Sequence, residues 1–465
     1  MLDRAELLLP AGSLVKLKTA ILYGADAVYA GTPDMCLRAQ SKFSIEELRE
    51  GIEFVHKHHK KIYLTLNLFM HNRDVEKLPS FVATLRELSP DGVLVADPGV
   101  FQYVRENAPE LNLFVSTQAN ICSWAAVKFW QSMGAKLCVL GREVTFEEVK
   151  EIRQKCPDIL LETFMHGAMC MSYSGRCLIS NYLADRSANQ GKCAHCCRWH
   201  YKLHLRLKDG TIKEIVINEQ NKDAFEFLLE EDFRPGEYYE VVEDEHGGYM
   251  LNSKDMCLLP RLPDLLSIGL DSLKVEGRNK TEYYAGIVAR TYRKAIDDWY
   301  ANSENWDWKK YMPELDCLQN RGYCLGFHDG KLTNISQNYE YTRTLGDWLF
   351  AGSIVRWEGD DAIFEIRNYI NSGEEIEFLL PNSLDTLKLR LNEFEDATSA
   401  EITPKVSAGE GKAIRLRPTV WNQPISEVKR KLPQYVIARK FQPLNGKQGD
   451  MLQRKQREFS QLCND

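Results

Sequence analysis

The first two thirds of the chain alternate short apolar runs with longer amphipathic stretches. Eight runs have the length of a buried strand and cover residues 6–9, 26–30, 62–68, 92–96, 113–116, 136–140, 160–165 and 272–275. Between the first seven lie stretches such as 45–59, 75–88, 124–133 and 145–155, each long enough for a crossover helix. Regular alternation of strand and helix predicts parallel strands.

Eight such units favour an α/β fold of the closed (β/α)8 type, a TIM-like barrel, over an open doubly wound sheet. The open sheet is the alternative, but no G-x-G-x-x-G turn follows the first apolar run. Apolar residues at helical spacing across 284–299 predict a long helix that completes the outer ring. About a hundred residues separate the seventh and eighth runs. An insertion after the carboxyl end of a barrel strand usually builds the active site.

The pattern changes after Trp308, where short alternating runs separated by turn residues fill 347–439. Such runs predict a small antiparallel β-barrel or sandwich. We therefore expect a barrel over 1–308 with an insertion over 166–260 that bears cysteines. A linker over 309–346 and a C-terminal β domain with a basic tail over 347–465 complete the expected organisation.

The composition fits a folded enzyme, because the 465 residues are 44% hydrophobic and 27% charged. Disorder is excluded as the dominant state. The net charge of -7 excludes a uniformly basic nucleic-acid-binding protein. The charge is unevenly spread, however: residues 429–457 carry nine cations against one acid, and residues 226–245 carry nine acids against one cation. The basic segment is a candidate contact for RNA phosphates or simply a solvated surface.

Thirteen cysteines are the unusual feature of the composition. The chain shows no signal-peptide segment and no run of eighteen apolar residues, so we expect no membrane association and a cytoplasmic protein with reduced thiols. Five of the cysteines fall within 28 residues, at Cys170, Cys177, Cys193, Cys196 and Cys197. Such clustering favours metal binding over simple packing of buried thiols.

The spacing of these thiols does not choose the metal. It matches neither the paired C-x2-C of a zinc ribbon nor the bacterial ferredoxin run, so an iron–sulfur cluster and zinc both remain open. Cys196 adds a thiol beside Cys197, and Cys257 returns a sulfur toward the barrel just before its last strand. Either could add a sulfur to a site of four thiolates.

Polar side chains follow six of the predicted barrel strands, whose carboxyl ends converge on one mouth. Among them we select Glu162, His166 and Arg278 as catalytic candidates. Arginines near this mouth are suited to an anionic small molecule, because guanidinium pairs bidentately with carboxylate; the candidates are Arg142, Arg176, Arg198 and Arg278. Tyr29, Tyr173 and Trp199 are candidate stacking partners for a base. No H-E-x-x-H, G-x-S-x-G or Walker motif is present.

The segment ETFMHGAMCMSYSGRCLIS resembles the signature of the collagenase-like peptidase family of unknown catalytic type. The resemblance extends to LLLPAGS, STQAN, GREVTFEEV, NQGKC and SLKVEGRNK, and so covers about residues 5–300. RPGEYYEVVEDEHGGY and QNYEY are similar to the branch of that family concerned with prephenate-dependent hydroxylation of tRNA uridine.

This resemblance implies a barrel with a 4Fe–4S cluster on Cys170, Cys177, Cys193 and Cys197. It also implies prephenate as a required metabolite and hydroxylation of the wobble uridine, in the anticodon loop of tRNA, to 5-hydroxyuridine. Cys196 and Cys257 are alternates to Cys197 in the implied set of four cysteines. Zinc is the alternative metal. A peptidase and a non-catalytic, metal-stapled RNA-binding protein are the alternative functions.

Overall fold

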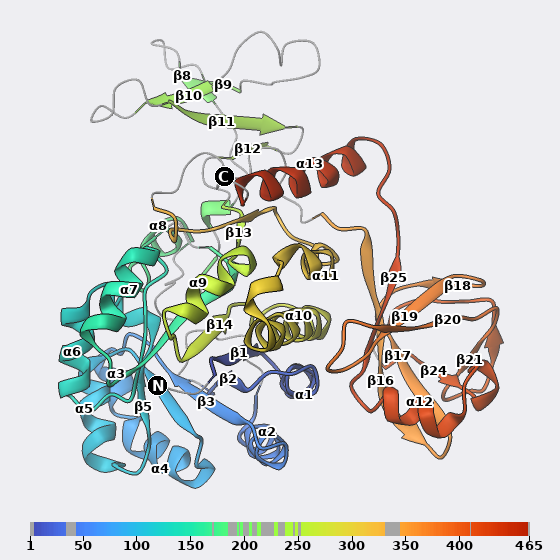
Figure 1. Cartoon of the computed structure of the whole chain (residues 1–465), viewed down its shortest axis with the longest axis horizontal. Helices are drawn as coiled ribbons and strands as arrows, with labels where there is room; N and C mark the ends of the chain where they lie inside the picture. Colours follow the sequence, from blue (N-terminus) through green and yellow to red (C-terminus); the bar gives the residue numbers. More distant parts are fainter. Residues whose placement is uncertain are drawn as a thin grey trace.

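The computed structural model describes residues 4–33, 43–169, 172–184, 193–194, 196–198, 204–206, 212–214, 227–230, 238–244, 247–249, 253–330, 345–409 and 411–463. Its central feature is a closed barrel of eight parallel strands (Figure 1). The strands are β1 (Glu6–Ala11), β2 (Ala27–Gly31), β3 (Lys61–Leu66), β4 (Gly92–Val95), β5 (Leu113–Val115), β6 (Leu137–Val139), β7 (Leu160–Ala168) and β14 (Ser272–Val275). β14 pairs in parallel with both β1 and β7 and closes the ring. The predicted TIM-like barrel is confirmed.

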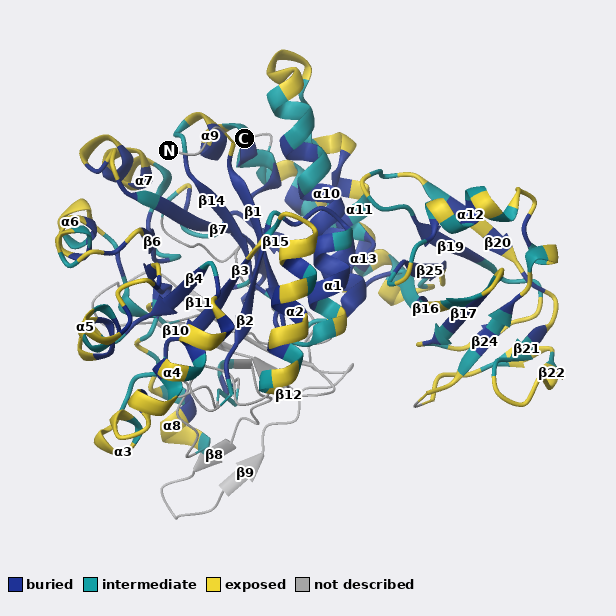
Figure 2. Cartoon of the chain, turned by 90° about the horizontal axis from the view of Figure 1, so that it is seen from below, coloured by how far each residue is buried: buried dark blue, intermediate teal, exposed yellow. Residues whose placement is uncertain are grey.

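Helices follow the strands and cover the outside of the ring. They are α1 (Leu14–Leu22), α2 (Ile45–Lys57), α3 (Asn72–Val75), α4 (Leu78–Leu88), α5 (Pro98–Asn107), α6 (Trp124–Ser132), α7 (Phe146–Lys155), α9 (Leu262–Ser267) and α10 (Glu282–Ala301). Helices α2 and α4–α7 turn exposed faces to solvent, whereas α10 is mainly buried (Figure 2). Ser44 with Glu47 and Thr145 with Glu148 form capping boxes that fix the starts of α2 and α7. The amphipathic stretches of the sequence therefore become the predicted outer helices.

The chain adds strands to the carboxyl end of β7, which runs three residues beyond its predicted end. β13 (Asp255–Cys257) pairs antiparallel with this extension, and β15 (Tyr323–Cys324) pairs in parallel with β13. Between β7 and β13 the described segments are α8 (Ile179–Ala184), the 3-10 turn η3 (Cys196–Arg198), the β8–β9 hairpin (His204–Arg206, Ile212–Glu214) and the sheet of β10 (Phe227–Glu230), β11 (Tyr238–Asp244) and β12 (Gly247–Tyr249).

The C-terminal domain is a curled, half-barrel antiparallel sheet with its own apolar core (Figure 1). Its strands are β16 (Trp348–Glu358), β17 (Asp361–Ile366), β19 (Glu375–Leu379), β20 (Thr386–Arg390), β21 (Phe394–Asp396), β22 (Ile402–Thr403), β24 (Ala413–Leu416) and β25 (Ile437–Phe441). β18 (Ile370–Asn371) pairs with β23 (Lys405–Val406), and α12 (Ile425–Lys431) precedes β25. Tyr23 of the barrel joins the two cores: its hydroxyl donates to Leu379 O at 2.7 Å and accepts from Ile437 N at 3.1 Å.

The last helix, α13 (Lys447–Leu462), leaves the β domain and returns to the barrel (Figure 1). Its buried face carries Leu452, Lys455 and Phe459, and the Phe459 ring packs 5.6 Å from that of Tyr323 on β15. The expected C-terminal domain, 347–465, therefore contains both the antiparallel sheet and a helix, α13, that packs against the barrel. The sequence pattern shows that α13 has an apolar face, but it does not show which surface that face covers. α11 (Met312–Asp316) and short 3-10 turns connect the remaining elements. No helix in the described ranges is long and apolar enough to cross a membrane.

Candidate active site at the barrel mouth

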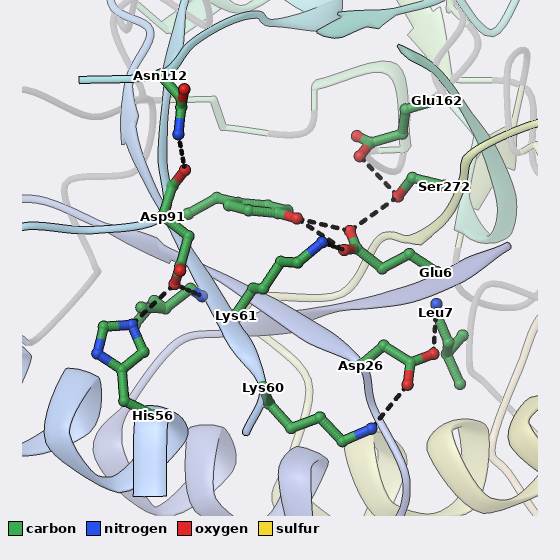
Figure 3. Close-up of polar contacts among 12 residues, drawn as sticks. Glu6, Leu7, Asp26, His56, Lys60, Lys61, Asp91, Asn112, Glu162 and Ser272 are labelled. Atoms are coloured by element: carbon green, nitrogen blue, oxygen red, sulfur yellow. Dashed lines mark hydrogen bonds and ion pairs between the residues drawn. The ribbon is translucent and has the colours of Figure 1, made fainter. Parts of the chain in front are cut away.

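A buried polar network fills the barrel below its mouth. Lys274 Nζ donates to Glu162 Oε1 at 2.7 Å, and Ser272 Oγ donates to Glu162 Oε2 at 3.0 Å. Ser272 and Lys274 are two residues apart on β14, so both point into the barrel. Deeper in, Glu6 accepts from Tyr63 and Lys61, and burial raises the pKa of its carboxyl group (Figure 3). The structure thus places the catalytic candidate Glu162 inside the barrel, in an ion pair with Lys274.

Two arginines lie above this network, at the carboxyl ends of β6 and β14. Arg142 Nη2 is 3.4 Å from Glu276 Oε2, and Arg278 Nη1 donates to Thr65 Oγ1 at 3.4 Å. The Nε atoms of both arginines are buried, and neither makes a hydrogen bond to a described residue. The Arg142 guanidinium lies 3.9 Å over the Phe164 ring. The mouth therefore holds two guanidinium groups with unused donors beside aromatic walls, as an anionic ligand requires.

Tyr29 forms part of these walls and is not free to stack on a base. Its hydroxyl donates to Val275 O at 2.9 Å and lies 3.4 Å from Glu276 Oε2. Its ring lies 4.4 Å from Lys274 Nζ and 5.6 Å from the Arg278 guanidinium carbon. The tyrosine thus separates the internal ion pair from the mouth.

His166 lies outside the mouth, in an aromatic layer between β7, α10 and β15. Its ring centroid is 5.5–6.0 Å from those of Tyr284, Tyr292 and Tyr323, and its Nδ1 is 3.2 Å from the Tyr292 hydroxyl. The side chain is 1% exposed, and burial lowers its pKa to about 3. The imidazole is therefore neutral at pH 7. In this position the His166 side chain packs between the three tyrosines, and it is not placed to exchange a proton with a substrate bound at the mouth.

The stretch of chain from Cys170 to Cys197, which we call the cysteine segment, follows β7. Local contacts hold its described parts together. Cys177 lies two residues before the start of α8, and η3, which contains Cys196 and Cys197, packs on α8. Ala194 N donates to Ser180 Oγ of α8 at 2.9 Å, which holds Cys193 beside the same helix. Cys177, Cys193 and Cys197 are partly exposed, whereas Cys196 is buried.

Three of the four expected ligands therefore belong to one α8–η3 unit, and the fourth, Cys170, lies outside the described residues. Within the described residues, no three Cys, His, Asp or Glu side chains are close enough together to hold a metal ion. The donor set fits a thiolate-bound metal in its chemistry: soft, accessible sulfurs on contacting segments. Trp199 and the side chain of Arg198 also lie outside the described part of the chain.

Glu143 fixes the cysteine segment to the barrel mouth. Its carboxylate accepts from the backbone N–H of Ser174, from Ser174 Oγ at 3.2 Å and from Asn120 Nδ2 at 3.2 Å. The next residue, Gly175, has a φ of +76°, and a Cβ there would lie 2.2 Å from Gln118 O. The loops after β5, β6 and β7 are thus joined three residues before Cys177.

Cys257, an alternate ligand, lies on the buried side of the β7 extension. It is paired with His166 across the β7–β13 ladder, and its Sγ is 3.7 Å from the Tyr292 hydroxyl. Burial raises the pKa of its thiol to about 12. A thiolate is therefore strongly disfavoured at Cys257 in this state.

The basic C-terminal segment is partly internal. Arg439 lies 3.0 Å from Glu377 and 3.2 Å from Glu314, and the Lys440 ammonium lies 2.8 Å from Glu374. Lys455 is buried and donates to Leu345 O at 3.0 Å. Arg430, Lys447, Arg454 and Arg457 remain exposed. Fewer cations of this segment are therefore exposed to a ligand than the nine counted in the sequence.

Sequence reasoning missed two residues of the site, Lys274 and Thr65. The signal for Lys274 was present: Ser272 and Lys274 alternate with apolar residues on the last barrel strand, and this spacing directs both inward. No sequence pattern distinguishes Thr65 from other strand threonines, because its role depends on Arg278 arriving from another loop.

Comparison with known proteins identifies the family of the chain. The family model described as Peptidase family U32 matches residues 12–338. The tRNA hydroxylation protein P of Escherichia coli is 39% identical over 432 residues, which are 89% of this chain and 93% of that protein. The tRNA hydroxylation protein P1 of Bacillus subtilis is 36% identical over 382 residues, covering 81% of this chain and 84% of that protein.

A more distant relative is named for the modification of ribosomal RNA. The 23S rRNA 5-hydroxycytidine C2501 synthase of Escherichia coli is 32% identical over 294 residues, covering 63% of this chain and 39% of that protein. The residues that the family model matches, 12–338, contain seven of the eight barrel strands, all but β1, together with the clustered cysteines. On this agreement of sequence and fold, the chain belongs to peptidase family U32.

Proposed function

We propose that this chain is a tRNA-modifying enzyme that hydroxylates the wobble uridine of the anticodon loop to 5-hydroxyuridine. Relatives that match along most of the chain are named tRNA hydroxylation proteins, and the rRNA relative is named for hydroxylation of a pyrimidine at the same ring position. The observation that carries the proposal is that Glu143 fixes the thiol-bearing segment at the mouth that also contains Arg142 and Arg278.

A 4Fe–4S cluster is the cofactor that this proposal assigns to the thiols, with zinc as the alternative. Cys170, Cys177, Cys193 and Cys197 would hold it, and a bound iron–sulfur cluster supplies one-electron transfer. Cys197 is preferred to Cys257 as a ligand because η3, which carries Cys197, packs on α8 beside Cys177 and Cys193, whereas Cys257 is buried beside Tyr292. The role of the α8–η3 unit is to hold its thiols together beside the mouth.

The required metabolite, prephenate, is a dianion with two carboxylates, which suits the arginines of the mouth. Arg278 contacts no carboxylate within the described residues, and its Nε makes no hydrogen bond there. Arg142 shares its charge with Glu276 across 3.4 Å. We assign Arg278 as the main carboxylate ligand and Arg142 as its neighbour, with the Tyr29 and Phe164 rings beside them.

The anticodon loop suits this site because its bases are already unpaired. A pyrimidine inside a duplex must leave the stack before its C5 can be reached, whereas a loop base enters a pocket at lower cost. The described mouth supplies cations and aromatic walls at the end of a barrel, where such enzymes carry their reactive groups.

The peptidase alternative has no support in His166 and Cys257, which are paired across β7 and β13. His166 and Cys257 both contact the Tyr292 hydroxyl, but burial lowers the pKa of the histidine to about 3 and raises that of the thiol to about 12. A cysteine nucleophile needs the opposite shifts, toward thiolate and imidazolium.

The test is mass spectrometry of tRNA nucleosides from a strain that lacks this chain and any parallel enzyme. We expect 5-hydroxyuridine and its derivatives to disappear and to return when the chain is supplied again. Unchanged levels in the deletion strain would overturn the proposal.

A further inference from the structure

Exposed apolar side chains are concentrated in the cysteine segment. Among the described residues, eleven large apolar side chains are exposed, and four of them lie within the eleven residues from Tyr173 to Leu183. Tyr182 is 88% exposed, Leu178 is 71% exposed and Tyr173 is 64% exposed. Folded proteins rarely leave such groups together in solvent without a binding role.

The backbone beneath these side chains is held in place. Tyr173 precedes Ser174, whose N–H and hydroxyl both donate to Glu143, and Tyr173 O accepts from Arg176 N at 3.0 Å. On α8, the buried Ser180 accepts from Ala194 N. Tyr173 and Tyr182 are therefore presented by fixed elements, which lowers the entropic cost of binding a ligand on them.

Leu178 and Tyr182 lie together at α8, just after a proposed cluster ligand, Cys177, and Tyr173 and Arg176 lie on the loop that leads into it. Tyr182 N donates to Leu178 O at 2.9 Å, so the two side chains lie one helical turn apart on the same side of α8. Figure 2 shows α8 mainly in the colour of exposed residues. Arg176, also exposed, adds a cation between Tyr173 and Cys177. We call Tyr173, Arg176, Leu178 and Tyr182 the α8 surface.

We propose that the α8 surface binds the unpaired bases of the substrate RNA loop that flank the modified base, an inference that rests on the proposed function. Tyrosine rings stack on any base, since each base has a π face, and arginine contacts phosphate. A surface of two tyrosines and one arginine next to Cys177 thus suits a single-stranded loop whose central base enters the mouth. A duplex offers no free base faces to these rings.

The experiment measures the affinity of the anaerobically purified full chain for an anticodon stem-loop RNA and for a blunt two-stranded duplex of the same stem. Variants Tyr173→Ala and Tyr182→Ala are compared with Phe129→Ala, which removes an exposed aromatic ring from α6 on the outer ring of helices. We expect each tyrosine variant to lose roughly 5- to 100-fold in affinity for the stem-loop, which is the range for stacking one base. Phe129→Ala should bind as wild type, and all proteins should bind the paired duplex weakly and equally.

Unchanged stem-loop affinity in both tyrosine variants would overturn the inference, as would an equal loss in Phe129→Ala. Tyrosine variants that keep RNA affinity but lose self-association would make the α8 surface a protein interface instead. The two proposals fail separately. If the wild-type chain does not restore 5-hydroxyuridine in the deletion strain, the proposed function falls. If it does, and the double tyrosine variant restores it equally and binds equally, only the α8 inference falls.

Discussion

Replacing Glu143 by Gln should release the cysteine segment while leaving the barrel intact. The carboxylate accepts three hydrogen bonds, two from Ser174 and one from Asn120. Glutamine can keep the oxygen that accepts from Ser174 N and Asn120, and its NH2 group can donate to the Ser174 hydroxyl, so the substitution removes the negative charge of the acceptor. A hydrogen bond to a charged group contributes about 1.5–3 kcal/mol and a neutral one about 0.5–1.5 kcal/mol, so the three bonds together should weaken by about 1.5–3 kcal/mol. Since 1.4 kcal/mol is a factor of ten, the segment should open about 10- to 100-fold more often.

Hydrogen exchange measured by mass spectrometry tests this expectation directly. Peptides covering residues 172–184 should exchange faster in Glu143→Gln, with the Ser174 amide among the most affected. The midpoint of thermal unfolding should change little, because Glu143 lies in a loop and contributes no side chain to the barrel core.

Glu148→Gln provides the matched control, because it makes the same chemical change five residues further along. Glu148 accepts from Thr145 N and Thr145 Oγ1, both at 2.8 Å, and caps α7; it makes no hydrogen bond to the described residues 172–184. Its effect should be small and confined to the start of α7, because glutamine also fits this position of a capping box. Equal exchange of residues 172–184 in wild type and Glu143→Gln would refute the reasoning, as would faster exchange there in Glu148→Gln.

Four further outcomes are expected. Arg278→Ala should lower the affinity for prephenate at least tenfold in calorimetric titration, with Arg278→Lys intermediate; wild-type affinity in the alanine variant would exclude the assigned contact. Glu162→Gln should lower the free energy of unfolding in urea by about 3–5 kcal/mol, because Lys274 is left buried without its partner, and a loss under about 1 kcal/mol would contradict a buried ion pair. Burial lowers the pKa of His166 in the folded state from 6.5 to about 3, so between these values only the unfolded state binds a proton on this side chain. The free energy of unfolding should therefore fall as pH falls from about 6.5 toward 3. His166→Asn should weaken this dependence in urea titrations, and an unchanged pH profile would count against burial of the imidazole. Cys170→Ala should lose iron and sulfide after anaerobic purification while Cys463→Ala keeps both, and equal contents would refute the ligand assignment.

The alternation of apolar runs was sufficient to predict the barrel, because each strand buried on both faces is an apolar run with a helix after it. The extension of β7 to Ala168 was not predictable in this way. His166 and Gly167 interrupt the apolar run, and the extension is stabilised by pairing with β13, which lies about ninety residues later in the chain. The return of α13 to the barrel likewise depends on a partner surface that its own sequence does not specify.

The candidate site was predictable as a set of residue types but not as a set of contacts. The polar residues after the strands include Arg142, Glu143 and Arg278, and all three lie at the mouth. That Glu143 binds the cysteine segment depends on three loops meeting, which spacing along the chain cannot reveal. His166 looked similar to these residues in sequence, yet the added strand β13 and helix α10 bury it.

The most direct test of the central claim, that the cysteine segment and tRNA hydroxylation belong to one site, is a complementation series read by nucleoside mass spectrometry. The deletion strain receives the wild-type chain, Cys177→Ala or Cys463→Ala at matched protein levels. Cys463 is a partly buried thiol just after the end of α13 and serves as the control. The account predicts that 5-hydroxyuridine derivatives return with wild type and Cys463→Ala and stay absent with Cys177→Ala. Full restoration by Cys177→Ala would contradict it.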